Sequence, residues 1–249
     1  MKNKINNIND KYCNMESDNE KNLHYELIRN YFKNSAQQKK GYYKGKTFNQ
    51  IETKLKKREM WKSYISLLDN IIDGNKKINR AIDVGCGMGN LVLELSHRGN
   101  ICSIVGMDFV KDTFQLASEN IHLFSGVTFI EGNITDIPFN KRSFNITFCL
   151  NVLHHIHLND LSKSLVELCR ITDKYLAIEI RNKNNIFDFW YDHFIESTHY
   201  KNLPINCYKI NEVNKIIKRQ GFMFKNMICN NIIPWISRRI ILVFERYVI

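Results

Sequence analysis

The sequence has no uninterrupted apolar run of the ~18 residues that a membrane-spanning helix requires. Its strongest candidate, residues 232–244, is broken by Arg238 and Arg239 and is typical of a loop that enters a strand. The amino terminus is polar and no apolar segment follows it, so no signal peptide is recognisable. These absences predict a cytoplasmic protein without a membrane span.

Cys-x-x-Cys spacing is also missing from the sequence. The seven cysteines, an odd number, are scattered along the chain, and Cys102 and Cys149 fall in stretches expected to be buried strands. This pattern is typical of reduced intracellular thiols and predicts neither a disulfide framework nor a metal site.

Acidic residues are outnumbered, because 25 Asp and Glu oppose 36 Lys and Arg and leave a net charge of +11. A basic chain raises the question of nucleic-acid binding. Many of the lysines lie near the N-terminal helices, at Lys39, Lys40, Lys44, Lys46, Lys54, Lys56 and Lys57. Solvated lysine faces are the commoner reason for such a pattern, so nucleic acid stays an alternative that is not favoured.

The most informative stretch is residues 81–90, where an apolar strand ends in Asp83 and passes into Gly85-x-Gly87-x-Gly89. Glycines in such a turn adopt backbone angles closed to other residues and keep side-chain atoms away from a ligand. A helix pattern follows at once, and the free N–H groups of a helix N-terminus favour a carboxylate or a phosphate. Tight strand-helix turns also use glycine for structural reasons alone, so further signals are needed.

Three more apolar runs supply those signals. Residues 101–108 end in Asp108, close to the ~20-residue offset of a carboxylate that accepts hydrogen bonds from ribose hydroxyls in a βαβ unit. Residues 127–133 and 144–151 follow, and each leads into polar positions. Ligands in such sheets bind at the carboxyl ends of the strands, which is where these polar residues fall.

In this order, the blocks IDVGCGMGN, GMDFV, FIEGNITDIPF and SFNITFCLNVLHHI resemble those of class I S-adenosylmethionine (SAM)-dependent methyltransferases. The group that includes the ubiquinone/menaquinone and many small-molecule methyltransferases is the most similar. The resemblance covers residues 78–181 well and the rest of the C-terminal half loosely. It implies SAM as cofactor and says little about the acceptor.

The resemblance also implies roles in cofactor binding. Asp83 would contact the amino-acid end of SAM directly or through water, Asp108 would bind the ribose hydroxyls, and Phe109 would lie beside the adenine. The remaining implied contacts come from Gly85, Cys86 and Gly87 by close backbone approach, Asn133 and Ile134 at the adenine edge, and Leu150 and Asn151 along the methionine moiety.

Two positions depart from the family, which usually has Asp where this chain has Asn133 and Asn145. The Asn133 amide oxygen can still pair with the adenine amino group, so binding is expected to survive.

A nicotinamide cofactor fits less well, because a dinucleotide loop requires G-x-G-x-x-G/A spacing and Asp83 would repel a pyrophosphate but suits an ammonium group.

The expected fold is α/β: a Rossmann-like, doubly wound, mostly parallel sheet with an antiparallel C-terminal strand pair and N-terminal helices. Residues 1–20 are expected to be a disordered tail, and 21–249 a single domain. Within it, 21–74 form a helical section, 78–181 the cofactor-binding core and 182–209 an acceptor lid. Helices are expected near 89–98, 111–120, 159–171 and 210–220, and strands at 175–180, 222–229 and 239–247.

Methyl transfer from a sulfonium needs mainly orientation and exclusion of water, and a general base only where the acceptor must lose a proton. His154, His155 and Glu179 are the candidates for that base, although local hydrogen bonding or packing would equally explain them. The aromatic segment 186–200 would either clamp a planar or apolar acceptor or dock on the core.

The favoured function is therefore a methyltransferase that acts on a small-molecule acceptor. An RNA-directed methyltransferase and a non-catalytic SAM-binding protein remain alternatives. Methylation of an exocyclic base nitrogen is disfavoured, because Leu150-Asn151-Val152-Leu153 stands where the Asn/Asp-Pro-Pro-aromatic loop would be. The sequence predicts neither the acceptor atom nor the oligomeric state.

Overall fold

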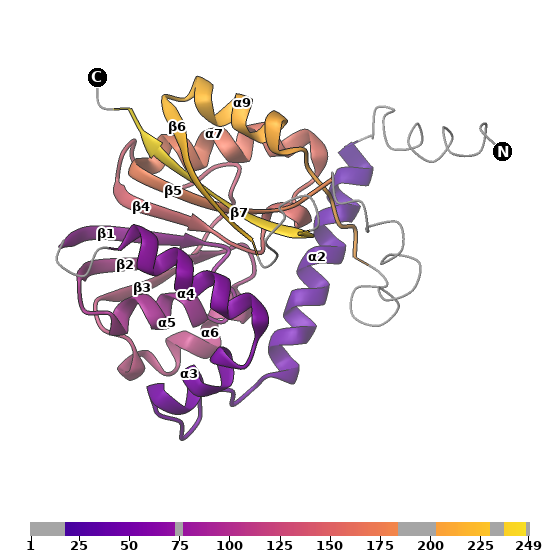
Figure 1. Cartoon of the computed structure of the whole chain (residues 1–249). Coiled ribbons are helices and arrows are strands. Elements are labelled where there is room, and N and C mark those ends of the chain that lie inside the picture. The colour runs from indigo at the N-terminus through magenta and orange to yellow at the C-terminus, as the bar shows by residue number, and fades with distance from the viewer. Residues whose placement is uncertain (1–17, 73–76, 184–202, 230–236, 248–249) are drawn as a thin grey trace.

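A computed structural model describes residues 18–72, 77–183, 203–229 and 237–247. Its centre is a seven-stranded sheet in the order β3-β2-β1-β4-β5-β7-β6 (Figure 1). The strands are β1 (Ile78–Val84), β2 (Ile101–Asp108), β3 (Val127–Glu131), β4 (Phe144–Cys149), β5 (Thr172–Arg181), β6 (Phe222–Cys229) and β7 (Arg239–Arg246). The first five are parallel, whereas β7 pairs antiparallel with both β5 and β6. The expected fold class, including its antiparallel ending, is confirmed.

The helices that connect the parallel strands lie close to their expected positions. They are α5 (Asn90–His97), α6 (Lys111–Ser118) and α7 (Leu161–Ile171), and α9 (Ile210–Arg219) precedes β6. Short 3₁₀ turns occur at Ile121–Leu123, Leu153–His155 and Leu158–Asp160. The fifth strand is longer than expected at both ends, because its central residues are buried against β4 and β7.

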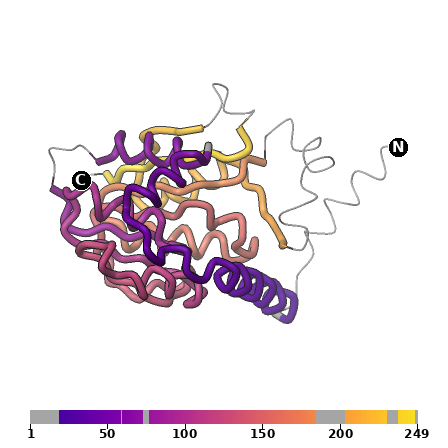
Figure 2. The backbone as a smooth tube through the Cα atoms, turned by 90° about the horizontal axis from the view of Figure 1, so that it is seen from below, coloured from indigo at the N-terminus to yellow at the C-terminus, as the bar shows by residue number. Residues whose placement is uncertain are grey.

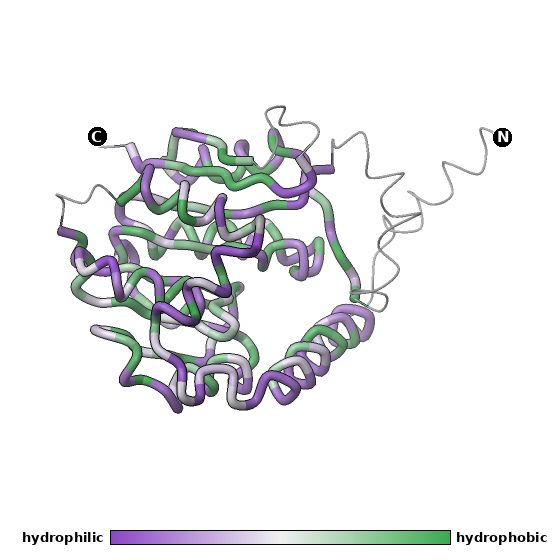
Figure 3. The backbone as a smooth tube through the Cα atoms, turned by 60° about the horizontal axis from the view of Figure 1, so that its bottom comes forward, coloured by the Kyte–Doolittle hydropathy of each residue, from purple (hydrophilic) through white to green (hydrophobic). Residues whose placement is uncertain are grey.

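Two hydrophobic clusters cover the two faces of the sheet. One joins Leu93 of α5 and Phe114 of α6 to the N-terminal helices, and the other joins Leu165 of α7 and Val213 of α9. Strand β1 is central, and its residues 81–84 are buried because the strand is covered on both faces. In Figure 3 the strands are largely green, whereas α2 alternates between green and purple.

The N-terminal section consists of α2 (Asp18–Gln38), α3 (Phe48–Lys56) and α4 (Glu59–Ile71). A capping box starts α3, because the Thr47 backbone N–H donates to the Gln50 side-chain oxygen at 3.0 Å. Helix α2 stands at the side of the sheet toward which the parallel strands point, and Figure 2 shows it as a separate coil beside the body. It therefore faces the edge of the sheet where ligands bind in α/β folds.

Some expectations concern residues outside the described ranges. Most of the tail at 1–20 and most of the lid at 182–209, including Trp190 and the rest of the aromatic segment, lie there. Within the described ranges, no helix is both long and apolar enough to cross a bilayer.

Candidate functional site

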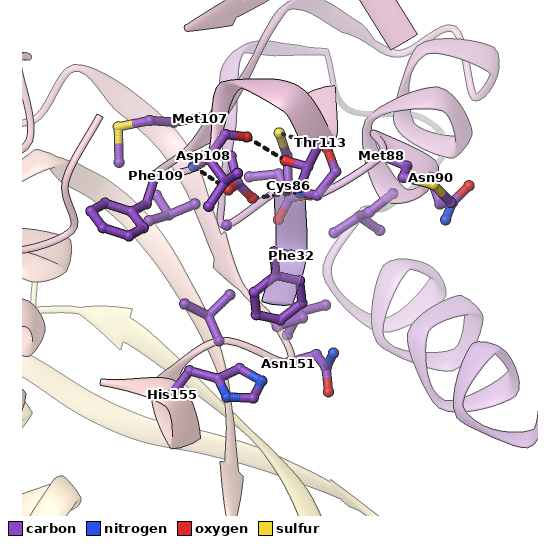
Figure 4. Close-up of a pocket in the computed structure, with 18 of the residues that line it drawn as sticks. Phe32, Cys86, Met88, Asn90, Met107, Asp108, Phe109, Thr113, Asn151 and His155 are labelled. Atoms are coloured by element: carbon purple, nitrogen blue, oxygen red, sulfur yellow. Dashed lines mark hydrogen bonds between the residues drawn. The ribbon is translucent and has the colours of Figure 1, made fainter. Parts of the chain in front are cut away.

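A cavity of about 280 Å³ lies at the carboxyl ends of β1, β2 and β4, where α2 and the start of α4 close it. It brings together all ten residues that the sequence predicts for cofactor binding: Asp83, Gly85, Cys86, Gly87, Asp108, Phe109, Asn133, Ile134, Leu150 and Asn151. Figure 4 shows several of them around one space. These side chains come from four separate loops, and the parallel sheet places those loops along a single edge.

The loop between β1 and α5 is held against β2 by its backbone. The N–H groups of Gly85 and Cys86 both donate to the Met107 carbonyl, at 2.7 and 3.0 Å. Gly85 has φ +82°, and a Cβ there would lie 2.1 Å from a methyl carbon of Val152. Gly87 has φ +52°, but a Cβ there would meet no protein atom within 4 Å. The first glycine is thus required by the fold, and the second leaves open space beside the backbone.

This difference predicts different outcomes for two matched alanine variants. Gly85→Ala should lower the free energy of unfolding by about 2–5 kcal/mol, because left-handed strain adds to a steric clash. Gly87→Ala should cost only about 1–2 kcal/mol of strain, yet weaken binding of SAM at least about tenfold by filling the space beside the loop. Denaturant unfolding without ligand and calorimetry with SAM measure the two effects. Unchanged affinity in Gly87→Ala would mean that no ligand approaches this backbone.

Asp108, the last residue of β2, is oriented before any ligand arrives. Its two carboxylate oxygens accept hydrogen bonds from the N–H groups of Gly87 at 2.7 Å and Val110 at 2.9 Å. Burial raises the pKa of Asp108, and the hydrogen bonds from the two N–H groups and from Thr113 partly offset this. A carboxylate has about four acceptor positions and the N–H groups of Gly87 and Val110 occupy one on each oxygen, so ligand hydroxyls would compete with Thr113 for the others.

Asp83 is buried in β1 and lines the same cavity. Burial, with the nearby charge of Asp108, raises the pKa of Asp83 to about 8. Within the described part of the chain, no side-chain cation pairs with it. A buried carboxyl without a cation is suited to bind a positively charged group.

The adenine side of the predicted site contains Phe109 and Asn133. The guanidinium of Arg29, from α2, lies 4.0 Å from the centre of the Phe109 ring. The Asn133 side-chain oxygen accepts hydrogen bonds from the backbone N–H and the hydroxyl of Thr135, both at 3.0 Å. In this arrangement the amide nitrogen, rather than the expected oxygen, is left for a ligand.

The end of β4 contributes Leu150 and Asn151. Asn151 has φ +61°, a left-handed conformation that a residue other than glycine seldom adopts. Its side-chain oxygen accepts a hydrogen bond from Arg239 at 2.9 Å. Strain of this kind is retained where surrounding contacts enforce it, and here the strained residue lines the cavity.

The three candidate bases occupy different environments. His155 lines the cavity, and burial lowers its pKa to about 3, so the ring is neutral and weakly basic. Figure 4 shows its ring beside Asn151. His154 is fully buried with its pKa well below the ordinary value, and its ring centre lies 4.1 Å from that of His155. Among the described lining residues, neither His154 nor Glu179 is present.

Glu179 instead lies behind the cavity wall. Its carboxylate accepts a hydrogen bond from the Tyr64 hydroxyl at 2.6 Å and lies 3.5 Å from the Arg239 guanidinium. Burial raises the pKa of Glu179, whereas Arg239 and Tyr64 act in the opposite direction. Because both Tyr64 and Asn151 line the cavity, Glu179 contacts the site through them. Its contribution to catalysis stays a prediction.

The sequence analysis did not anticipate how much of the cavity the N-terminal helices form. One face of α2 lines it, with Tyr25, Ile28, Phe32, Ser35 and Ala36 at helical spacing, and Lys39 adds to this wall directly after the helix ends. Helix α4 and the residue before it add Arg58, Met60, Trp61 and Tyr64. In Figure 4 the Phe32 ring lies between Asp108 above and Asn151 below.

Tyr43 ties the turn between α2 and α3 to the glycine loop. Its hydroxyl donates to the Met88 carbonyl and lies 3.2 Å from the Asn90 side-chain oxygen. The ring is buried, and burial raises the pKa of Tyr43 well above its usual range. No cluster of three or more His, Cys, Asp or Glu that could hold a metal ion occurs in the described ranges.

A family profile described as "Methyltransferase domain" matches residues 81–174. A demethylmenaquinone methyltransferase of Bacillus licheniformis is 27% identical over 103 residues, which cover 40% of this chain and 43% of that protein. The U6 snRNA methylphosphate capping enzyme Amus of Drosophila melanogaster is 24% identical over 152 residues, covering 46% of this chain and 51% of that protein. The chain thus spans about half the length of the curated relatives it matches.

The fold is also similar to that of the magnesium protoporphyrin IX methyltransferase of Synechocystis PCC 6803, solved with bound SAH. That structure has a TM-score of 0.65 and 18% sequence identity, and the match covers 90% of this chain and 100% of the other. The matched range of the profile contains the glycine loop and Asp108. The matched methyltransferase domain, the methyltransferase relatives and the shared fold together support placing the chain in the class I SAM-dependent methyltransferase superfamily.

Proposed function

We propose that the chain transfers a methyl group from SAM to a small-molecule acceptor. The observation that carries this proposal is the apolar wall of the cavity, which α2 and α4 form beside the cofactor-binding loops. Since both the helices and the sheet edge line this cavity, we treat residues 21–249 as one functional domain, with a cytoplasmic location inferred from the thiol pattern. We make no proposal for its oligomeric state.

The residues present fit the cofactor. Asp108 can accept hydrogen bonds from ribose hydroxyls, Asp83 suits the ammonium group, and the open side of Gly87 leaves space for close approach. When bound, SAM supplies an activated methyl group on a sulfonium leaving group. The protein then has to orient the acceptor in line and exclude water, which the apolar side chains of α2 and α4 can do. An acceptor that loses a proton would find His155 as the one candidate base lining the cavity among the described residues.

Two alternatives remain. One is methylation of an RNA, which the net charge of +11 favours, and the other is SAM binding without catalysis. A SAM-consumption assay on separate metabolite, RNA and protein extracts separates the three. We expect turnover with the metabolite extract alone. Turnover with RNA would replace the proposal, and SAM binding without turnover on any extract would support the non-catalytic alternative.

The raised pKa of Asp83 predicts a pH dependence of cofactor binding. Since the ammonium group favours the carboxylate, binding below pH 8 must release the proton that the free protein holds. SAM affinity should therefore rise between pH 6 and pH 8, by up to about tenfold per pH unit. Calorimetry across this range measures the effect, and Asp83→Asn should show a flat profile.

The same group should affect the stability of the unliganded protein in the opposite direction. An unfolded aspartate titrates near pH 4, so between about pH 4 and pH 8 the folded state holds a proton that the unfolded state has lost. The contribution of Asp83 to stability is thus complete below about pH 4 and is lost as pH rises toward about 8. An unfolding free energy that differs between wild type and Asp83→Asn by the same amount at pH 5 and pH 8 would contradict this assignment.

A further inference from the structure

Most of the excess positive charge lies in one segment of the chain. Residues 33–62 contain ten Lys and Arg but two Glu, which is a net +8 out of the total of +11. This segment comprises the end of α2, α3 and the start of α4, which Figure 1 shows together at the lower end of the molecule. A general compositional bias would distribute the charge along the chain, so its concentration beside the cavity needs a local cause.

Two cations of this segment, Lys39 and Arg58, line the cavity itself. In the described part of the chain neither forms an ion pair, and partial burial together with the charge of Arg58 lowers the pKa of Lys39. The acids among the described lining residues are Asp83 and Asp108, which belong to the cofactor side. Two solvent-exposed cations therefore lie at one cavity without a counter-charge among the described lining residues, an arrangement suited to binding an anion.

The cofactor alone does not account for both cations. SAM carries a single carboxylate, and its amino-acid end is assigned to the loop between β1 and α5. That loop leads into the N-terminus of α5 at Asn90, where free backbone N–H groups favour a carboxylate. At least one cation is thus left for another anion.

The wall next to these cations is apolar and ring-rich. Phe32 from α2, Leu55 from α3 and Trp61 from α4 line the same cavity. The Trp61 indole nitrogen is buried and has no hydrogen-bond partner in the described ranges. Because that nitrogen is enclosed by protein, Trp61 contributes its apolar ring, rather than its donor, to the cavity wall.

We propose that the methyl acceptor is an organic anion with a planar, apolar body, whose acidic group binds between Lys39 and Arg58. Its body lies against Phe32, Leu55 and Trp61. The acidic group is a carboxylate, sulfonate or phosphate, which share the negative oxygens that these cations recognise. The surrounding charge of residues 33–62 attracts such an acceptor to the cavity. This inference rests on the proposed function and narrows its acceptor class.

The test compares 2-naphthoate with 2-naphthamide, which share a planar body and differ in charge. Calorimetry on the protein saturated with S-adenosylhomocysteine (SAH) should show the acid binding about tenfold more tightly, the effect of one charge-assisted hydrogen bond. The double variant Lys39→Gln/Arg58→Gln should lose this preference and retain SAH affinity. The control Lys40→Gln/Lys57→Gln removes the same charge from equally exposed neighbouring positions that do not line the cavity, and should keep the preference.

Four outcomes would overturn the proposal. If 2-naphthoate and 2-naphthamide bound equally tightly, or if neither bound, there would be no anion site between Lys39 and Arg58. An equal loss of the preference for the acid in both double variants would indicate a general effect of positive charge. If a single-stranded RNA oligonucleotide then bound with the same dependence on all four residues, residues 33–62 would be assigned to nucleic-acid binding. Loss of SAH affinity in Lys39→Gln/Arg58→Gln would assign the cations to the cofactor carboxylate. Failure of the wild-type protein to bind SAH would instead refute the proposed function.

Discussion

Asp108→Ala is expected to weaken SAM binding by about 30- to 150-fold. The carboxylate would accept hydrogen bonds from two ribose hydroxyls, and each charge-assisted bond contributes roughly 1.5 kcal/mol, or ~3 kcal/mol together. The structure adds a second reason, because the same carboxylate fixes the N–H of Gly87. Removing it loosens the glycine loop as well as the ribose contact. Calorimetry with SAM measures the total effect.

Two further variants separate these contributions. Asp108→Asn keeps one carbonyl oxygen and should lose less affinity than Asp108→Ala, since an amide accepts through one oxygen only. Asp112→Asn, on α6 and outside the described cavity lining, should leave SAM affinity unchanged. Wild-type affinity in Asp108→Ala would place the ribose elsewhere and contradict the proposed cofactor geometry.

The sheet was predictable because its strands carry local signals. The run of residues 101–108 is apolar and ends in an acid, and Gly85 marks the sharp turn that no other residue fits. The resemblance implied the antiparallel ending, but the sequence did not predict that β7 inserts between β5 and β6. That the candidate cofactor residues line one cavity was predictable for a related reason: they lie at strand ends, and parallel strands bring their ends to one edge.

The acceptor side of the cavity was not predictable in this way. Phe32 and Trp61 belong to helices whose apolar residues look like ordinary core positions, and their sequence spacing does not indicate which helix face meets the sheet edge. Tyr43 lies in the turn between α2 and α3, where the sequence carries no signal for a contact partner. Long-range packing determines these contacts, and only the structure brings Tyr43 to Met88.

Glu179→Ala is expected to lower the free energy of unfolding by about 3 kcal/mol or more. Glu179 is buried, and its removal leaves the Tyr64 hydroxyl and the Arg239 guanidinium without their carboxylate. Breaking a buried pair by deleting one partner is costly, because the remaining charge stays desolvated. Tyr64→Phe removes only the 2.6 Å hydrogen bond and should cost about 1.5–3 kcal/mol. Urea unfolding without ligand measures both values.

Kinetics of Glu179→Gln then decide between a positioning residue and the general base suggested by the sequence. Glutamine keeps the shape and an oxygen for Tyr64 but cannot take up a proton in catalysis. If Glu179 acts by holding Tyr64 and, through Arg239, the strained Asn151, the folded variant should retain kcat within about tenfold and show its main change in KM. A kcat reduced by more than about 100-fold, with wild-type unfolding free energy and SAM affinity, would instead establish proton transfer by Glu179. The geometry favours the first result, because Glu179 reaches the cavity only through other side chains. Tyr64, which lines the cavity, donates a hydrogen bond to Glu179, and Asn151, which also lines it, shares Arg239 with Glu179.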